Sequence, residues 1–244
     1  MLRAMLKDCD WSLDRDYKTG SENEPLQFYL DGLANSNEFN LLLGYFSSSA
    51  INLLSVGFAT FISKGGKMKM VINHLLSAKD KQAIEKASQE SINKVFDLTD
   101  VVSLGRVLDE YDTHFFECLA YLIAEKRIEI KVIKPKNGKG IAHYKSGVFS
   151  DGQDAVGYQA SCNFTYYGLS ENIEQLEALR LDYIGHRLGM RHQFCSMLTV
   201  QARTRQAQAH IGSHGNIVDH EHFIQGCFKS AQGLSDRRVA VGPI

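Results

Sequence analysis

Apolar and polar residues follow two different spacings along the chain, and these spacings predict strands that alternate with helices. Continuous apolar runs such as FNLLLGYF (39–46) are typical of strands covered on both faces, whereas apolar residues at every third or fourth position are typical of helices. The predicted strands are 39–46, 67–73, 128–134, 142–149, 155–161 and 176–182. The predicted helices are 25–36, 48–63, 79–96 and 106–126.

Residues that favour helix starts and turns separate these elements. Ser21, with Glu24 three residues later and then Pro25, predicts the start of the first helix. Two glycines at 65–66 end the second helix, and the Ser-Asp-Gly turn at 150–152 predicts a β-hairpin. Strands alternating with helices, together with a hairpin, predict an α/β sandwich with a mixed central sheet.

The length and composition predict one domain with additional segments at its ends. A chain of 244 residues with 44% hydrophobic residues can bury a full core, which excludes global disorder. We expect an N-terminal extension at 1–25, the main domain at 26–182, and a C-terminal helical extension or partly mobile tail at 183–244. Apolar periodicity is weak in that last segment, which is rich in histidine.

The cysteines and the apolar stretches indicate a cytoplasmic protein that does not insert into a membrane. The five cysteines are odd in number and scattered, which is typical of a reducing compartment. The segment 39–63 has no charged residue over 25 positions, long enough to span a bilayer. It also contains asparagines, serines and a glycine, so a buried strand followed by a buried helix is the favoured interpretation.

Charge is distributed unevenly along the chain. The net charge of −1 argues by itself against nucleic-acid binding. However, residues 126–145 contain seven basic residues against Glu129 alone, a local charge of +6. Its Gly- and Pro-containing part, KPKNGKG, is also compatible with an ordinary solvated loop. Because this window leads directly into His143, we expect four of its lysines to contact a nucleic-acid backbone: Lys131, Lys134, Lys136 and Lys139.

The strongest chemical signal is a histidine, a lysine and an amide that the predicted hairpin brings together. On a strand, His143 and Lys145 point to the same face because they are two residues apart. Asn163 lies just beyond the second strand of the hairpin. An imidazole can attack phosphorus while an ammonium and an amide hold the non-bridging oxygens, which is phosphoryl transfer without a metal. Ser161 belongs to the same set, and Glu174 is expected to orient the imidazole.

This set resembles the motif of the phospholipase D superfamily, HxK followed by (G/S)xN, in the branch of restriction-type nucleases and nuclease domains of defence helicases. The resemblance covers about residues 26–182. The matching residues are His143, Lys145, Gly147, Phe149, Asp151, Ser161, Asn163, Thr165, Gly168, Asn172 and Glu174. The chain departs from the family pattern at Ala160, where a glycine is usual. In the broad family pattern the aspartate falls one residue before Asp151, and the resemblance gives this aspartate a structural role.

The resemblance implies a phospholipase D-like α/β/α sandwich and a phosphodiesterase that uses no metal or cofactor. In the implied two-step displacement His143 becomes a phosphohistidine, which water hydrolyses, and a second histidine protonates the leaving oxygen. The chain has no second His-x-Lys, so the resemblance implies a homodimer with two copies of His143 in one site. The expected substrate is DNA in a restriction or phage-defence setting, with a helicase or specificity protein as a further partner.

Some residues are compatible with a metal site instead. Glu129 and Lys131, with Asp109 or Asp112, match the E-x-K pattern of metal-dependent nucleases, although E-x-K is frequent on exposed strands. Four histidines of the C-terminal segment have spacings that allow zinc binding, although a solvated His-rich tail is favoured. They are His210, His214, His220 and His222.

Other residues and other functions stay open at this point. His74 and His114 are expected to be structural. Four tyrosines are candidates either to stack on bases or to be buried in strands: Tyr144, Tyr158, Tyr166 and Tyr167. The alternatives to a DNA nuclease are a hydrolase of phospholipids or other small phosphodiesters, and a non-catalytic module for nucleic-acid binding or dimerisation. An amphipathic surface helix would favour the lipid alternative.

Overall fold

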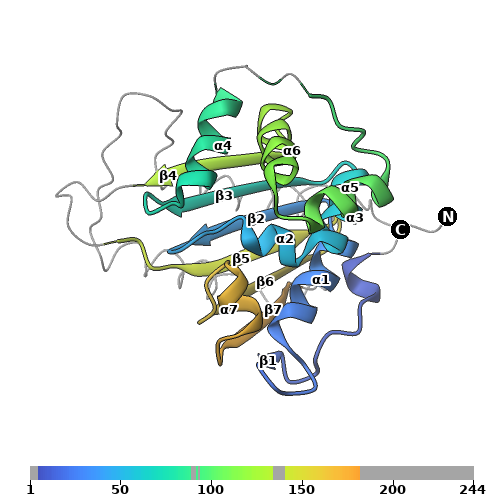
Figure 1. Cartoon of the computed structure of the whole chain (residues 1–244). Helices are drawn as coiled ribbons and strands as arrows, with labels where there is room; N and C mark the ends of the chain where they lie inside the picture. The colour runs from blue at the N-terminus through green and yellow to red at the C-terminus, as the bar shows by residue number, and fades with distance from the viewer. Residues whose placement is uncertain (1–4, 89–91, 93, 134–140, 182–244) are drawn as a thin grey trace, which may run out of the picture.

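A seven-stranded mixed sheet forms the centre of the protein (Figure 1). The computed structural model describes residues 5–88, 92, 94–133 and 141–181. The strand order is β1-β7-β6-β5-β2-β3-β4; β2, β3 and β4 are parallel, and the other neighbours are antiparallel. The predicted α/β class with a mixed sheet is therefore confirmed. The strands are β1 (Asp16–Lys18), β2 (Glu38–Leu43), β3 (Lys67–Asn73), β4 (Ile128–Ile133), β5 (Lys145–Ser150), β6 (Ala155–Ala160) and β7 (Gln175–Leu181).

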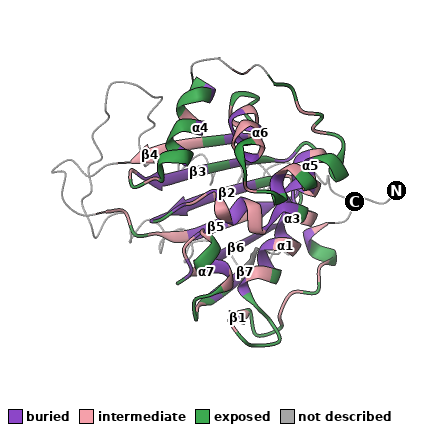
Figure 2. Cartoon of the chain, in the orientation of Figure 1, coloured by how far each residue is buried: buried purple, intermediate pink, exposed green. Residues whose placement is uncertain are grey.

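The described helices pack on one face of this sheet (Figure 1). They are a short 3-10 helix η1 (Leu6–Asp8), α1 (Pro25–Asn35), α2 (Ser49–Leu53), α3 (Ser55–Ser63), α4 (Ala78–Ser88), α5 (Val101–Asp109), α6 (Thr113–Ala124) and α7 (Tyr166–Ser170). Figure 2 shows that buried residues concentrate in the strands and in the helix sides turned toward them. Among the described residues no helix covers the other face of the sheet, so the expected second helical layer is not seen there, and the segment 183–244 lies outside the described residues.

An aromatic core fills the space between the sheet and these helices. Phe39 of β2 stacks on Phe149 of β5 with ring centroids 4.0 Å apart. Tyr29 of α1 packs edge-on against Tyr158 of β6 and lies near Phe164, and all of these rings are buried. Burying such rings is the main source of stability that a domain of this kind has. The core therefore holds β2, β5 and β6 in a fixed register beneath α1.

The helices differ from their predicted bounds where a capping or turn residue interrupts the apolar spacing. The predicted helix 48–63 divides at Leu54 into α2 and α3, and the predicted helix 106–126 divides between α5 and α6. Tyr111 lies in that second break with a positive φ of 37°, and the Asp112 side chain accepts hydrogen bonds from the first turn of α6. The first helix begins after Glu24 rather than in a Ser21 capping box, since Ser21 Oγ instead bonds to backbone carbonyls.

Residues assigned from the sequence to an N-terminal extension contribute to the same core. β1 pairs with β7, and the side chain of Leu6 is fully buried. The backbone N–H of Leu6 donates a 2.9 Å hydrogen bond to the carboxylate of Asp151, which also accepts from two backbone N–H groups of the β5–β6 turn. Asp151 thus fastens the N-terminal segment to the hairpin, in keeping with the structural role expected for it.

The uncharged stretch 39–63 folds as β2 followed by α2 and α3, which confirms its interpretation as a buried strand followed by a buried helix. No helix in the described part of the chain has the length and apolar character needed to cross a membrane.

Candidate active site

His143 and Lys145 meet where β2 ends and β5 begins. Lys145 pairs with Leu43, so its side chain is on the sheet face that carries the helices. Its Nζ lies 3.0 Å from Nε2 of His143. An ammonium group only donates hydrogen bonds, so in this contact Nε2 is the acceptor and faces the charge of Lys145. The two side chains thus lie together, as their spacing predicts, and His143 is exposed.

Two residues after β2 bring the imidazole into place. A Cβ atom at Gly44 would lie only 2.9 Å from both the carbonyl oxygen of Ala142 and Cα of His143. A glycine is therefore required for the two segments to lie side by side. The ring of Tyr45 meets the imidazole edge-to-face, with centroids 6.2 Å apart and an interplanar angle of 86°. Sequence reasoning missed Tyr45, because its contact with His143 depends on the pairing of β2 with β5.

The same loop after β2 also holds the segment that carries Asn163. Phe46 forms a β-bridge with Phe164, and the N–H of Ser47 donates a 3.0 Å hydrogen bond to the Phe164 carbonyl. Since Tyr45 contacts His143 and the next residue contacts Phe164, the histidine and the amide flank one short piece of chain. The Oδ1 atom of Asn163 is buried and has no hydrogen-bond partner among the described residues. The structure therefore places Asn163 and His143 next to the same short segment, and a direct contact between the two side chains stays a prediction.

Glu174 and Ser161 form a pair of their own beside these residues. The Ser161 hydroxyl donates to Oε2 of Glu174, and Asn172 donates to Oε1 over 3.2 Å. Two hydrogen bonds join the backbone of Glu174 to Thr19. The Thr19 N–H donates to the Glu174 carbonyl, and the Glu174 N–H donates to the Thr19 hydroxyl oxygen. Within the described part of the chain, the carboxylate is thus held by Ser161 and Asn172. The expected direct support of the imidazole by Glu174 stays a prediction.

Thr19 was missed from the sequence because it lies in the segment taken as an extension. It is 155 positions from Glu174 along the chain, and no local pattern indicates the pairing of β1 with β7. The position of the carboxylate is therefore set by a long-range contact.

The electrostatics of the site centre on Lys145. Partial burial lowers the pKa of its ammonium group, and the negative charge of Glu174 opposes this lowering. An opposite charge nearby favours the charged form of a group, which is why Glu174 acts against the effect of burial. Cys162, between Ser161 and Asn163, has its pKa raised to about 12 by burial, so it remains a thiol. The site therefore offers one cation, one imidazole, one amide and one carboxylate.

The lysines expected to contact a nucleic-acid backbone are only partly described. Lys131 lies on β4 and forms a 2.9 Å ion pair with Glu129. Because Ile130 and Val132 pack on the helix-side core, Lys131 lies on the opposite face of the sheet from Lys145. Its proposed contact with DNA stays a prediction, and Lys134, Lys136 and Lys139 lie outside the described residues.

The residues of the alternative metal site are far from forming a cluster. Asp109 accepts a hydrogen bond from Ser55 and Asp112 caps α6, both on the helix side, whereas Glu129 lies on the other sheet face. Among the described residues, no group of three or more His, Cys, Asp or Glu side chains is placed to hold a metal ion. The four histidines considered for zinc binding lie outside the described residues.

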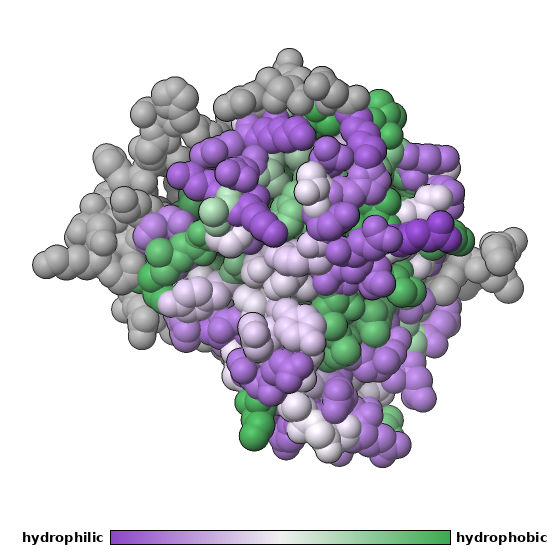
Figure 3. Space-filling view, viewed as in Figure 1, coloured by the Kyte–Doolittle hydropathy of each residue, from purple (hydrophilic) through white to green (hydrophobic). Residues whose placement is uncertain are grey.

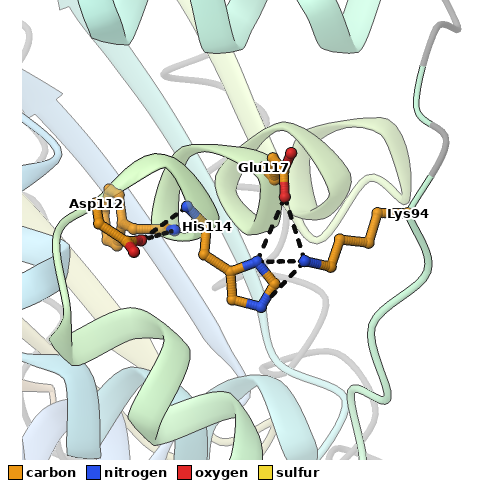
Figure 4. A network of polar contacts seen from close by, with 5 residues as sticks. Lys94, Asp112, His114 and Glu117 are labelled. Carbon is orange, nitrogen blue, oxygen red and sulfur yellow. Dashed lines mark hydrogen bonds and ion pairs between the residues drawn. The ribbon is translucent and has the colours of Figure 1, made fainter.

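Two other described histidines have local surroundings of their own. His114 lies between Lys94 and Glu117 in a network of polar contacts on α6 (Figure 4). His74 follows β3, and its buried Nδ1 has no hydrogen-bond partner in the described part of the chain. His114 thus links α6 to the segment before α5, in agreement with the structural role expected for it.

The four candidate tyrosines differ in exposure. Tyr158 is fully buried, so of the two alternatives it is a buried strand tyrosine and cannot stack on a base. Tyr144 is half-buried against Leu42 and Val71 on the far face of the sheet. Tyr166 and Tyr167 are exposed, at 40% and 69%.

Comparisons with known proteins find similar backbones but no family model. No protein-family model matches the chain, and a search of curated proteins finds no match. NucT from Helicobacter pylori is 15% identical with a TM-score of 0.40, over 75% of this chain and 94% of that one. Nuc from Salmonella typhimurium, a phospholipase D family member, is 12% identical with a TM-score of 0.39, over 81% and 97%.

A third similar structure is a yeast tyrosyl-DNA phosphodiesterase, 13% identical with a TM-score of 0.41. The match covers 75% of this chain and 36% of that protein. At these identities and TM-scores, the function has to be inferred from the geometry of the site.

Proposed function

We propose that the protein is a phospholipase D-like phosphodiesterase that cleaves DNA without a metal ion. The observation that carries this proposal is the 3.0 Å contact between Nζ of Lys145 and Nε2 of His143. It puts a cation beside Nε2 of an exposed imidazole, the atom proposed to attack phosphorus. Asn163 and Glu174 belong to the same site, and the resemblance of the motif to phospholipase D enzymes supports the assignment.

The proposed reaction has two balanced steps. In the first, the Nε2 lone pair of His143 attacks phosphorus, an N–P bond forms, and the P–O bond to the leaving oxygen breaks. That oxygen takes a proton from a general acid. In the second, water attacks phosphorus, the N–P bond breaks, and the water proton passes to the group that gave the first one. Lys145 and the Asn163 amide stabilise the charge on the non-bridging oxygens.

The general acid is proposed to be His143 of a second copy of the chain. His114 is engaged by Lys94 and Glu117, and the Nδ1 atom of His74 is enclosed. A two-fold axis through the site would bring two His143 side chains together and make one site from two subunits. We further propose a restriction or phage-defence role, with a helicase or specificity protein as partner, on the basis of the motif resemblance.

Plasmid cleavage in excess EDTA tests the proposal. The wild-type protein should nick or cut DNA in EDTA, and His143→Ala should abolish cleavage. His114→Ala is the matched control, because this histidine sits in a separate network. Cleavage that stops in EDTA, or that survives in His143→Ala, would contradict the proposal.

The intermediate and the dimer can be tested separately. Reaction with labelled DNA should yield a covalent adduct that is stable in base, labile in acid and absent from His143→Ala, as expected for a phosphohistidine. After subunit exchange with an equal amount of His143→Ala, a site that needs both histidines should show about a quarter of the activity of the same total amount of wild-type protein, because about a quarter of the dimers are then wild type in both subunits. Retention of half would show that each chain works alone. Protection of cells from phage infection, compared between wild type and His143→Ala, tests the defence role.

A further inference from the structure

Two tyrosine rings stand in solvent directly after the site asparagine. Tyr166 and Tyr167 open the short helix α7 and are 40% and 69% exposed, whereas Tyr29 and Tyr158 are fully buried in the core. The two exposed rings meet edge-to-face, with centroids 5.6 Å apart at 89°. In Figure 3 the surface around α2 and α7 is mostly pale, whereas the surface over α4 and α6 is mostly hydrophilic purple. The rings therefore form a compact aromatic surface beside the site.

The backbone fixes this surface relative to Asn163. Thr165 caps α7 by accepting a 3.1 Å hydrogen bond from the Gly168 N–H. A Cβ atom at Gly168 would collide with the carbonyl of Asn163, so the helix packs directly on the asparagine backbone. The Tyr166 N–H donates a 3.0 Å hydrogen bond to Ser49 Oγ, which ties α7 to the first residue of α2, just after the loop that contacts His143. An exposed residue held this firmly is suited to binding rather than to packing.

The charge around the rings favours an uncharged ligand surface. Between Ser161 and Ala178 the sequence contains three glutamates and no Lys or Arg. One of them, Glu171, accepts a 3.3 Å hydrogen bond from the Tyr166 hydroxyl. Phosphate groups are repelled by such surroundings, whereas the face of a nucleobase is neutral and stacks on aromatic rings. The cation that can hold a phosphate in this site is Lys145, beside His143.

We propose that Tyr166 and Tyr167 are a stacking platform for a nucleobase of the DNA whose phosphodiester lies at His143 and Lys145. In a duplex the neighbouring bases cover both faces of each base, so an exposed platform selects unpaired DNA. Single-stranded or locally unpaired DNA is then the preferred substrate. This inference rests on the proposed phosphodiesterase function, and it adds the substrate form and the residues that select it.

Binding in a His143→Ala background tests the platform without cleavage. The probes are a fluorescein-labelled oligothymidylate, an abasic oligonucleotide of the same length, and the same oligothymidylate paired in a duplex. Fluorescence anisotropy in EDTA should show the tightest binding for the single strand. Adding Tyr167→Ala should weaken that binding by about 5-fold to 150-fold, the range for loss of one base–aromatic stack, and should change abasic binding by less than about 2-fold.

Two further variants separate stacking from other effects. Tyr167→Phe keeps the ring and should bind the oligothymidylate within about 2-fold of the parent. Val102 on α5 is also 69% exposed, so Val102→Ala removes equally exposed apolar surface away from α7 and should change nothing. The platform is refuted if the parent binds the abasic strand or the duplex as tightly as the single strand. Equal loss for all three probes in Tyr167→Ala refutes it as well.

The underlying chemistry is checked independently with methyl 4-nitrophenyl phosphate, a phosphodiester that has no base. Wild-type hydrolysis in EDTA that disappears in His143→Ala supports the phosphodiesterase, whatever the binding results are. If this hydrolysis is present but base-dependent binding is absent, only the platform is wrong. If the hydrolysis is absent, the proposed function itself is wrong.

Discussion

Replacing Gly44 by alanine should push His143, the proposed nucleophile, away from the residues around it. The added Cβ would lie 2.9 Å from the Ala142 carbonyl oxygen, 2.9 Å from Cα of His143 and 3.3 Å from its carbonyl carbon. All three atoms belong to the backbone, so no flexible side chain can give way. Ordinary Cβ contacts begin near 3.4 Å, and the difference from 2.9 Å is 0.5 Å. Residues 142–143 must therefore retreat from β2 by about that distance.

This displacement gives a rough size for the loss of activity. A misplacement of about 1 Å at a reacting group costs on the order of 100-fold in rate, so half of it should cost about 10-fold in kcat. KM should change little, because Lys145 and Asn163 are held by β5 and by the loop around Phe46. Overpacking should also lower the free energy of unfolding by about 1–3 kcal/mol.

Steady-state hydrolysis of a small phosphodiester and chemical denaturation measure the two effects. The matched control is Gly105→Ala on α5, where the new Cβ would meet the Ala59 side chain at an ordinary 3.6 Å. Removing a helix-interior glycine there should raise stability by about 0.5–1 kcal/mol and leave kcat unchanged. If Gly44→Ala behaves like Gly105→Ala in both assays, the close approach of residue 44 to His143 is not what positions the nucleophile.

Three further predictions follow from the site and from the hairpin. Burial lowers the pKa of Lys145 from 10.5, so activity that needs the ammonium group should fall as pH rises through the lowered value. Because Glu174→Gln removes the charge that opposes this lowering, it should move the alkaline limb of the kcat/KM profile to lower pH. An unmoved limb would exclude Lys145 as its cause. Ser161 and Glu174 share one hydrogen bond, so the effects of Ser161→Ala and Glu174→Gln on kcat should be non-additive in a double-mutant cycle. Simple additivity would show that this bond does not contribute to kcat. Asp151→Asn removes one acceptor for a buried N–H, so it should lower the free energy of unfolding by about 1.5–3 kcal/mol. Circular dichroism should show a Tm lower by several degrees, whereas Asp14→Asn at an exposed position should leave Tm unchanged. Equal Tm values for the two variants would contradict the structural role of Asp151.

The pairing of His143 with Lys145 was predictable because strand geometry determines it locally. Residues two apart on an extended segment share a face, and a hairpin with a Gly-containing turn brings the following loop back beside them. The same reasoning located Asn163 and the strands β3, β5 and β6 closely. These predictions needed only spacing and turn chemistry.

Features that depend on distant contacts were not predictable in this way. The apolar run 39–46 does not show that Tyr45 turns toward an imidazole about a hundred residues later. Thr19 reaches Glu174 only because β1 completes the sheet beside β7. The helix α7 is too short to show a helical period, and the break at Tyr111 depends on a positive φ that the apolar spacing hides. In each case tertiary structure overrides a weak local signal.

The electrostatics of the site bear directly on how the protein would hold DNA. Of the cations in the basic window that the structure describes, Lys145 reaches the site, whereas Lys131 is paired with Glu129 on the opposite face of the sheet. A site with one partly buried cation gains little binding affinity from a long phosphate backbone. Each phosphate that a cation neutralises adds to the affinity by releasing counterions, and here one cation supplies that effect. Affinity must then come from contacts that are indifferent to salt. In the proposed function the exposed rings of Tyr166 and Tyr167 would supply such contacts, so a protein with a net charge of −1 would discriminate DNA by its bases rather than by its charge.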